Sequence, residues 1–303
     1  MRFSVWPNLQ QPWADVAGVV HHAEATGWDG AYVADHFMGD GSSFGTPATP
    51  TLEATAAIGA LAAGTQRVRL GTLVLGMTYR HPAVLAKWAA TVDHVSGGRL
   101  LLGIGTGWQE NEHEQYGIEL GSRPERIDRF EEGCQVLRGL LRDASTTVAG
   151  HHYRVTAAGA EPKPVQDPLP ILIGGKGDRM MGVIARYADE WNMWGLAPDI
   201  AERSAVLDQR CAAIDRDPTT VRRSCQALVR ITDDADQAER FLAATGGRAA
   251  VAGPVERVAE ACAAWQDAGV DEVIFPDFAM GTGQRRLDQL DAIIEQVAPE
   301  FRS

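Results

Sequence analysis

A carboxylate and an imidazole stand side by side at Asp35 and His36, directly after a short apolar run from Ala31 to Ala34. If that run is a parallel strand, the pair lies where the strand meets its loop, and α/β barrels place their catalytic groups there. An imidazole at the mouth of a barrel can donate or accept a proton. We therefore expect His36 to be the proton donor or acceptor of an active site, oriented by Asp35. The alternative is a loop carboxylate beside a solvated histidine.

The segment GGKGDR, from Gly174 to Arg179, follows an apolar run and precedes a helix expected from Met180 to Ala188. The N-terminus of a helix offers free backbone N–H groups and the positive end of its dipole, so such a turn attracts phosphate. Its spacing matches neither the dinucleotide fingerprint nor the P-loop. A tight turn that needs glycine for its backbone angles alone is the alternative. The residues that we expect at a phosphate are Gly174, Gly175, Lys176, Gly177 and Arg179.

Aromatic and acidic side chains near these segments are candidates for a pocket wall. Trp191 and Trp194 lie at the tip of a short strand beside the glycine-rich turn, where two tryptophans can wall a flat ring or simply pack. Asp35, His36 and His81 can also be read as metal ligands. That interpretation needs an HxH-type strand motif and ligands at other strand ends, which the sequence lacks, so no metal site is expected.

Strands and helices must bring these groups together, and the stretch from Arg67 to Gly117 shows how. An apolar run from Val68 to Leu75 is followed by a helical pattern from Val84 to Val95 and by a second strand from Arg99 to Ile104. This βαβ unit requires parallel strands, and function in such units lies at their carboxyl ends. The second strand ends in Gly105-Thr106-Gly107.

Strand-like and helical segments alternate along the whole chain, and the pattern predicts an α/β fold, a (β/α)8 TIM barrel with an insertion after strand 4. Residues 108–168 are less regular and lack flanking linkers, so we predict one domain over residues 1–303 with the insertion inside it. The seventh strand is expected from Cys225 to Ile231. The approximate centres or starts of the strands are Phe3, Ala31, Val68, Leu100, Ile171, Glu190, Ala227 and Glu272.

Composition limits the function. The chain has 303 residues, 45% of them hydrophobic, which is enough for a large core. Twenty-eight basic and 40 acidic residues give a net charge of −12, which disfavours nucleic acid and anionic membranes as partners. Four scattered cysteines without a CxxC pair indicate reduced thiols in a cytoplasmic protein. No signal peptide or run of about 18 apolar residues is present. The loop from Met38 to Pro50, rich in Gly, Ser, Thr and Pro, is either a flap or a plain connector.

The order of these motifs resembles the bacterial luciferase-like superfamily over nearly the whole chain. Within it, the chain looks most like the actinobacterial oxidoreductases that use the deazaflavin coenzyme F420. The motifs that carry the resemblance are Trp28-Asp29-Gly30 leading to Asp35-His36-Phe37, RLGTLVLGMTYRHPAVLAKWAATVDHVSGGRLLLGIGTGWQENEHEQYG, PKPVQ, ILIGGKGDR and YADEWN.

The resemblance implies a barrel that holds a flavin or deazaflavin ring at the carboxyl ends of its strands. It implies a bulge with a cis peptide at Leu73-Val74, against one face of the ring. By the same likeness, Asp35 and His36 are polar groups beside the ring, Thr106 and Gly107 lie beside the ring or its ribityl chain, and Gly174 to Gly177 with Arg179 bind the phosphate. A homodimer is also implied.

One position departs from the sugar-phosphate dehydrogenases of this superfamily. There the GTG motif is followed by a catalytic Glu, whereas Trp108 stands here, so a glucose-6-phosphate type of reaction is not expected. We expect Trp108, Glu112 and Trp194 to line the substrate pocket. The predicted function is hydride transfer between coenzyme F420 and an unidentified small organic substrate. The alternatives are an FMN-dependent monooxygenase on the same barrel, a cofactor carrier without catalysis, and the metal-dependent barrel hydrolase.

Overall fold

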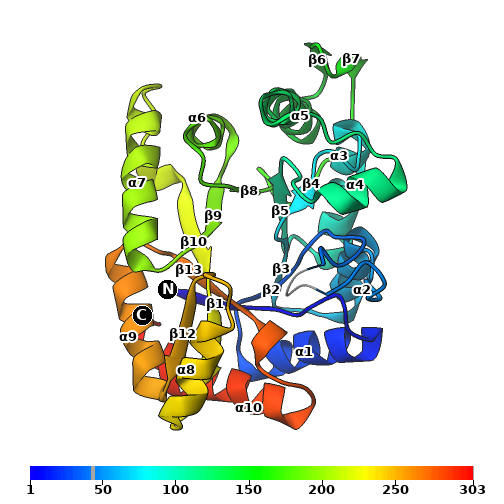
Figure 1. Ribbon diagram of the computed structural model, residues 1–303. Coiled ribbons are helices and arrows are strands. Elements are labelled where there is room, and N and C mark those ends of the chain that lie inside the picture. Colours follow the sequence, from blue (N-terminus) through cyan, green and yellow to red (C-terminus); the bar gives the residue numbers. More distant parts are fainter. Residues whose placement is uncertain (42–44, 303) are drawn as a thin grey trace.

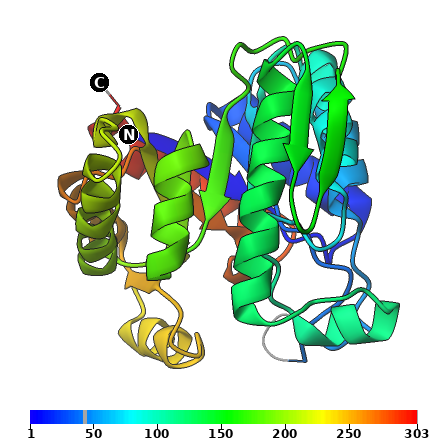
Figure 2. The same cartoon turned by 90° about the horizontal axis from the view of Figure 1, so that it is seen from above.

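A closed barrel of parallel strands forms the centre of the computed structural model, which describes residues 1–41 and 45–302 (Figures 1 and 2). Its strands are β1 (Arg2–Trp6), β2 (Gly30–Val33), β3 (Arg69–Thr72), β4 (Leu75–Gly76), β5 (Leu100–Gly105), β8 (Ile171–Gly174), β9 (Glu190–Trp194), β10 (Arg222–Gln226) and β13 (Glu272–Pro276). The hydrogen-bonded order is β3, β2, β1, β13, β10, β9, β8, β5, and β3 pairs with β5 to close the ring. Short β4 continues β3 beyond an interruption. The predicted (β/α)8 barrel is confirmed.

Helices surround the barrel because each crossover between parallel strands returns over the outer face. Neighbouring helices pack in chain order, from α2 through α3, α5, α6 and α7 to α9. The amino group of Met1 donates to the carbonyl of Phe301 at 2.8 Å, so the two ends of the chain lie side by side. The helices of this layer are α1 (Trp13–Thr26), α2 (Ala54–Gly64), α3 (Pro82–Ser96), α5 (Arg123–Arg142), α6 (Asp178–Tyr187), α7 (Ala197–Ala212), α9 (Val255–Asp267) and α10 (Gln284–Ala292).

The irregular stretch of residues 108–168 contains one regular barrel helix. α5 begins with a capping box between Ser122 and Glu125 and packs between α3 and α6. The additional elements are the short α4 (Glu110–Tyr116) and an antiparallel hairpin that packs on α5 (Figure 2). The hairpin strands are β6 (Thr146–Ala149) and β7 (Arg154–Ala158).

The seventh predicted strand is wrong in one respect, since the segment from Cys225 to Ile231 belongs to two strands. β10 ends in the barrel at Gln226, and β11 (Leu228–Ile231) pairs outside the barrel with β12 (Ala250–Gly253), next to α8 (Ala235–Ala243). Both halves are buried and apolar, so periodicity alone does not show the break between them. As a result, Gln226 lies at the carboxyl end of a barrel strand.

Apolar side chains fill the middle of the barrel, and they form a cluster separate from the larger core between strands and helices. This interior cluster consists of Trp6, Tyr32, Leu73, Leu101, Leu172 and Ile274. It leaves open space only toward the carboxyl ends of the strands. All four cysteines are free and buried, as expected. In the described part of the chain, none of the helices combines the length and the apolar character that crossing a membrane requires. Residues 42–44 of the predicted flap or connector lie outside the described residues.

Candidate active site

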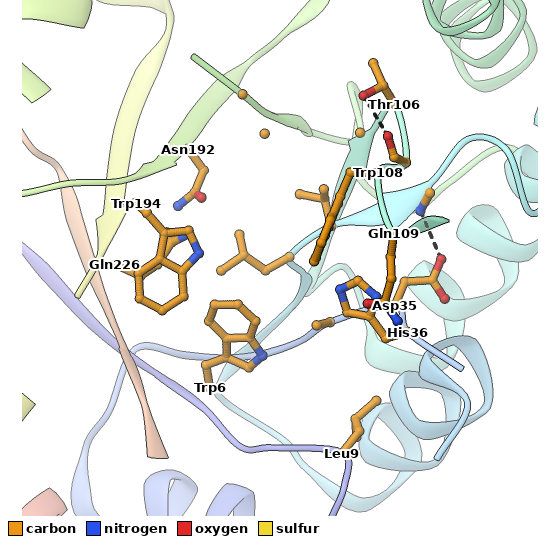
Figure 3. A pocket seen from close by; sticks show the side chains of 18 of the residues that line it. Trp6, Leu9, Asp35, His36, Thr106, Trp108, Gln109, Asn192, Trp194 and Gln226 are labelled. Carbon is orange, nitrogen blue, oxygen red and sulfur yellow. Dashed lines mark hydrogen bonds between the residues drawn. The ribbon is translucent and has the colours of Figure 1, made fainter. Parts of the chain in front are cut away.

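A cavity of about 450 Å³ opens at the carboxyl ends of the barrel strands (Figure 3). Every barrel strand contributes to its lining, either with its last residues or with the loop that follows. This is the location that the parallel architecture dictates for a ligand site. The predicted site residues that line it are Asp35, His36, Leu73, Val74, Thr106, Gly107, Trp108, Gly174, Gly175, Lys176 and Trp194.

The bulge between β3 and β4 forms one wall of the cavity. The peptide bond between Leu73 and Val74 is cis, as the resemblance implies. Thr72 ends β3, and its Oγ1 both donates to the carbonyl of Gly103 at 2.8 Å and accepts from its N–H at 2.9 Å. A Cβ on Gly103 would lie 1.7 Å from the carbonyl oxygen of Thr72. Only glycine fits there, so the glycine in β5 permits the bulge.

Small residues also surround the side chain of Val74. A Cβ on Gly105 would lie 2.7 Å from Val74 Cγ2, and one on Gly174 would lie 3.2 Å from Val74 Cγ1. Val74 therefore fills the space that side chains at these two strand ends would occupy. The result is a smooth apolar wall with glycine backbone beside it, and a flat ring system can approach such a wall closely.

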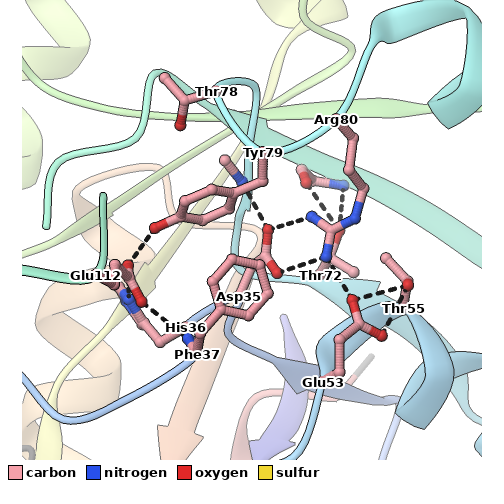
Figure 4. A network of polar contacts seen from close by, with 12 residues as sticks. Asp35, His36, Phe37, Glu53, Thr55, Thr72, Thr78, Tyr79, Arg80 and Glu112 are labelled. Carbon is pink, nitrogen blue, oxygen red and sulfur yellow. Dashed lines mark hydrogen bonds and ion pairs between the residues drawn. The ribbon is translucent and has the colours of Figure 1, made fainter. Parts of the chain in front are cut away.

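His36 faces this wall from the end of β2, and a buried carboxylate holds it. Its Nδ1 lies 3.0 Å from Oε1 of Glu112, a side chain of α4 with no exposed surface. Glu112 also accepts the backbone N–H of Phe37 at 2.8 Å and the hydroxyl of Tyr79 (Figure 4). Because an ionised carboxylate only accepts, Nδ1 carries a proton and Nε2 is left for the cavity.

The protonation states in this cluster follow from its hydrogen bonds. Burial by itself would raise the pKa of Glu112, but hydrogen bonds from His36, Tyr79 and Phe37 hold that pKa below its ordinary value. Burial and the adjacent Glu112 carboxylate raise the pKa of Tyr79, so its hydroxyl remains a neutral donor. Glu112 was expected to line the substrate pocket. Instead it lies behind His36, because three donors turn its carboxylate away from the cavity.

Asp35 has a different role from the predicted one. Its carboxylate accepts from both terminal nitrogens of Arg80, at 2.6 and 2.9 Å, and from the N–H of Gly76 at 3.0 Å. Arg80 also pairs with Glu53, whose carboxylate caps α2 (Figure 4). Burial raises the pKa of Asp35, although Arg80 opposes that effect. Asp35 therefore fixes β4 beside the bulge, and Glu112 is the group that orients His36.

The predicted phosphate segment is only partly at the cavity. Lys176, Gly174 and Gly175 line it, whereas Gly177 is the N-cap of α6. Arg179 is half exposed and pairs with Asp128 on α5, so its guanidinium points away from the cavity. The interpretation of Arg179 as a phosphate ligand is therefore not supported by its position.

A second cavity of about 660 Å³ shares Thr106 to Gln109 with the first. Arg123 and Arg126 of α5 lie along it, together with the carboxylates of Asp40 and Glu110. Arg126 donates to the carbonyl of Gly107 at 3.1 Å, which places one guanidinium directly behind the GTG turn. The sequence analysis did not single out either arginine for this role.

The wall opposite His36 contains residues that the sequence analysis missed. Trp6 contacts Trp194, with ring centroids 5.7 Å apart, and Phe278, at 5.0 Å. Asn192 and Gln226 are buried beside them and also line the cavity. A signal existed for Trp6, the last residue of a strand broken by Pro7. Gln226 was hidden because its strand was predicted to run on to Ile231.

The metal interpretation of Asp35, His36 and His81 does not match their positions. His81 is the N-cap of α3, and its Nδ1 accepts the N–H of Ala83 at 3.2 Å. Asp35 is bound to Arg80 and His36 to Glu112, so the three side chains do not converge. Across residues 1–41 and 45–302, no group of three or more His, Cys, Asp or Glu side chains could hold a metal ion.

Comparison with known proteins agrees with this architecture. The model of the luciferase-like monooxygenase family matches residues 1–246. The uncharacterized protein Rv0953c of Mycobacterium tuberculosis is 30% identical over 252 residues, which are 83% of this chain and 77% of that protein. An F420-dependent glucose-6-phosphate dehydrogenase of Nakamurella multipartita is 35% identical over 181 residues, 58% of this chain and 50% of that enzyme.

A solved structure has the same fold. An F420-dependent secondary alcohol dehydrogenase in complex with an F420–acetone adduct superposes with a TM-score of 0.86 at 20% identity, over 100% of this chain and 99% of that chain. Monooxygenases are also among the relatives and the structural neighbours. These similarities thus cover both deazaflavin enzymes and oxygenases.

Proposed function

This chain belongs to the luciferase-like monooxygenase family, and we propose that it is an oxidoreductase that moves a hydride between coenzyme F420 and a small organic substrate. The observation that supports the proposal best is the pair of His36 and Glu112, which presents a proton-transfer group to a cavity walled by Leu73 and Val74. F420-dependent enzymes among the relatives favour this coenzyme.

The residues at the cavity fit such a coenzyme. The wall of Leu73 and Val74 suits the face of a flat ring, and the glycines beside Val74 leave room for it. Thr106 and Gly107 would lie along the chain attached to the ring, and Lys176 beside the N-terminus of α6 would hold the phosphate. When bound, the deazaflavin would supply a two-electron carrier that takes or gives a hydride.

The protein contributes a proton route and a dry surface. His36 Nε2 can take the proton that a substrate hydroxyl loses as its carbon is oxidised, or return it in the reverse direction. Glu112 stabilises the imidazolium that results, because its carboxylate is buried and ionised beside Nδ1. Trp108 packs edge-on against the imidazole at 5.4 Å and shields it from solvent.

The second candidate is an FMN-dependent monooxygenase. It is favoured by the monooxygenases among the relatives, one of which is 30% identical over 62% of this chain. The same wall and phosphate segment would serve both coenzymes, so the proposal depends on a direct comparison of the two.

Two titrations test the proposal. The purified protein is titrated with F420 and with FMN, and each Kd is obtained from the change in coenzyme fluorescence. The proposal requires F420 to bind at least about tenfold more tightly than FMN, a difference of about 1.4 kcal/mol. Preference for FMN would support the monooxygenase instead. Binding of neither would refute the assignment of the cavity to a flavin-type coenzyme.

A further inference from the structure

The half of the cavity opposite His36 is aromatic. Trp6, Trp194 and Phe278 form a continuous wall there, in which the Trp6 ring is tilted by 46° to Trp194 and by 71° to Phe278. In Figure 3, Trp6 and Trp194 face Trp108 and His36 across the open space. Aromatic faces on one side and an aromatic edge on the other favour a flat or cyclic guest.

One buried polar atom in this half lacks a partner. Gln226 is 3% exposed, and its Oε1 makes no hydrogen bond with any described residue. Its strand register places it between Trp194 of β9 and Ile274 of β13. The neighbouring amide of Asn192 differs, since its Nδ2 donates to Ser224 Oγ at 3.0 Å. A buried acceptor without a donor is unfavourable, so Gln226 is suited to receive an O–H or N–H from a ligand.

Charge is missing from the same half. Among the described residues that line the cavity, the charged side chains besides His36 are Asp35 and Lys176. Asp35 is already paired with Arg80, and Lys176 lies after β8 beside the N-terminus of α6. A carboxylate or phosphate next to Trp6 and Trp194 would therefore be buried without a counter-charge, which is strongly unfavourable.

We propose that this half of the cavity selects an uncharged cyclic substrate that carries an O–H or N–H donor at the end remote from its reacting group. The ring lies between Trp108 and the wall of Trp6 and Trp194, the reacting carbon lies near His36, and the remote donor binds Gln226 Oε1. Gln226 is then a specificity-determining residue. The reacting end rests on the proposed function, whereas the binding preference does not.

Three benzyl alcohols that differ only in the para substituent test the preference. 4-Hydroxybenzyl alcohol has a remote donor, 4-methylbenzyl alcohol has a methyl group of similar size, and 4-carboxybenzyl alcohol is charged. Their Kd values are measured by titration calorimetry on the protein saturated with reduced coenzyme. Because alcohol and coenzyme are then both reduced, no turnover interferes.

The proposal requires the hydroxy compound to bind at least about tenfold more tightly than the methyl compound, and the carboxylate to bind most weakly. Gln226→Met, which keeps the length of the side chain but not the amide, should reduce the preference to less than about threefold. Gln209→Leu, at an exposed position on α7, should leave it unchanged.

Three outcomes would overturn the proposal: equal binding of the two neutral compounds by the unaltered protein, an unchanged preference in Gln226→Met, or tightest binding of the carboxylate. Weakening of coenzyme binding by Gln226→Met as large as the loss of preference would also overturn it, because Gln226 would then bind the coenzyme. The titrations use F420 or FMN, whichever binds. A failed F420 assignment and a failed substrate preference are therefore separate results.

Discussion

The two ends of the barrel treat buried polar groups in opposite ways. At the amino ends of the strands, Arg2 and Arg69 bind Glu190 and Glu272, with contacts of 2.8 to 3.5 Å. Tyr32 donates to Glu272 at 2.9 Å, and Ser4 donates to the same carboxylate oxygen. Each of the two carboxylates is thus matched by donors from within the barrel. Such a closed network lets charged groups close this end without a ligand.

At the carboxyl ends, pairing is incomplete. His36 uses one ring nitrogen on Glu112 and presents the other to the cavity, and Gln226 Oε1 has no partner within the described chain. The interior apolar cluster separates this end from the charged network. The contrast teaches where function lies: charges that satisfy one another contribute to stability, whereas groups left unsatisfied on a pocket wall are available to a ligand.

The largest expected effect is on stability at the amino end. Glu272→Ala leaves Arg2 and Arg69 with one carboxylate fewer and removes the acceptor of Ser4 and Tyr32. The free energy of unfolding in urea should fall by about 3–5 kcal/mol. Coenzyme affinity of the folded protein should stay within about twofold. Glu256→Ala, at an exposed position of α9, is the control and should change stability by less than about 0.5 kcal/mol.

The next effect is on catalysis at the carboxyl end. His36→Ala removes the proton-transfer group, so kcat for oxidation of 4-hydroxybenzyl alcohol with F420 should fall by about 10²–10³-fold. The Kd of F420 should change by less than about threefold, because Leu73, Val74 and the glycines remain. If coenzyme affinity falls together with kcat, His36 mainly holds the ring, and the contrast between the two ends loses its catalytic part.

Glu112→Gln tests whether the residue behind His36 acts through it. An amide keeps the shape but loses the charge and cannot accept all three donors, so kcat should fall by about tenfold with little change in KM. Glu112→Asp should recover part of the loss, and Glu114→Gln, exposed on the same helix, should have no effect. A rise in KM without a change in kcat would mean that Glu112 only maintains the shape of the pocket.

A smaller effect separates the two cations of the glycine-rich turn. Lys176→Gln should weaken coenzyme binding by about three- to fivefold, whereas Arg179→Gln should not, because Arg179 is bound to Asp128. Fluorescence titration of the two variants side by side measures the difference. Equal weakening would mean that Arg179 leaves Asp128 when the coenzyme binds.

The smallest effect is a pH dependence of stability. Since the pKa of Glu112 lies below its ordinary value of 4.5 in the folded protein, its contribution is complete above about pH 4.5 and is lost as the pH falls through the lower, folded value. The stability difference between the unaltered protein and Glu112→Gln should therefore shrink from about pH 7 to about pH 3. A constant difference would mean that the charge of Glu112 does not contribute.

Much of this site can be read from the chain because its parts are local. A strand end, the glycines that allow a close approach and the start of a helix each occupy a few consecutive residues. His36, the bulge at Leu73 and Val74, the GTG turn and Lys176 were found in this way. The parallel βαβ pattern then places all strand ends on one side, whatever the details of packing.

The partners of these groups depended on tertiary structure. His36 and Glu112 are separated by 76 residues, and Asp35 and Arg80 by 45. Sequence proximity suggested that Asp35 serves His36, but the packing of α4 against the end of β2 brings in Glu112 instead. Gln226 was missed because an apolar run does not reveal where a strand leaves the barrel. Local patterns determine which residues reach a strand end, and only packing between distant segments decides which polar groups pair and which stay available.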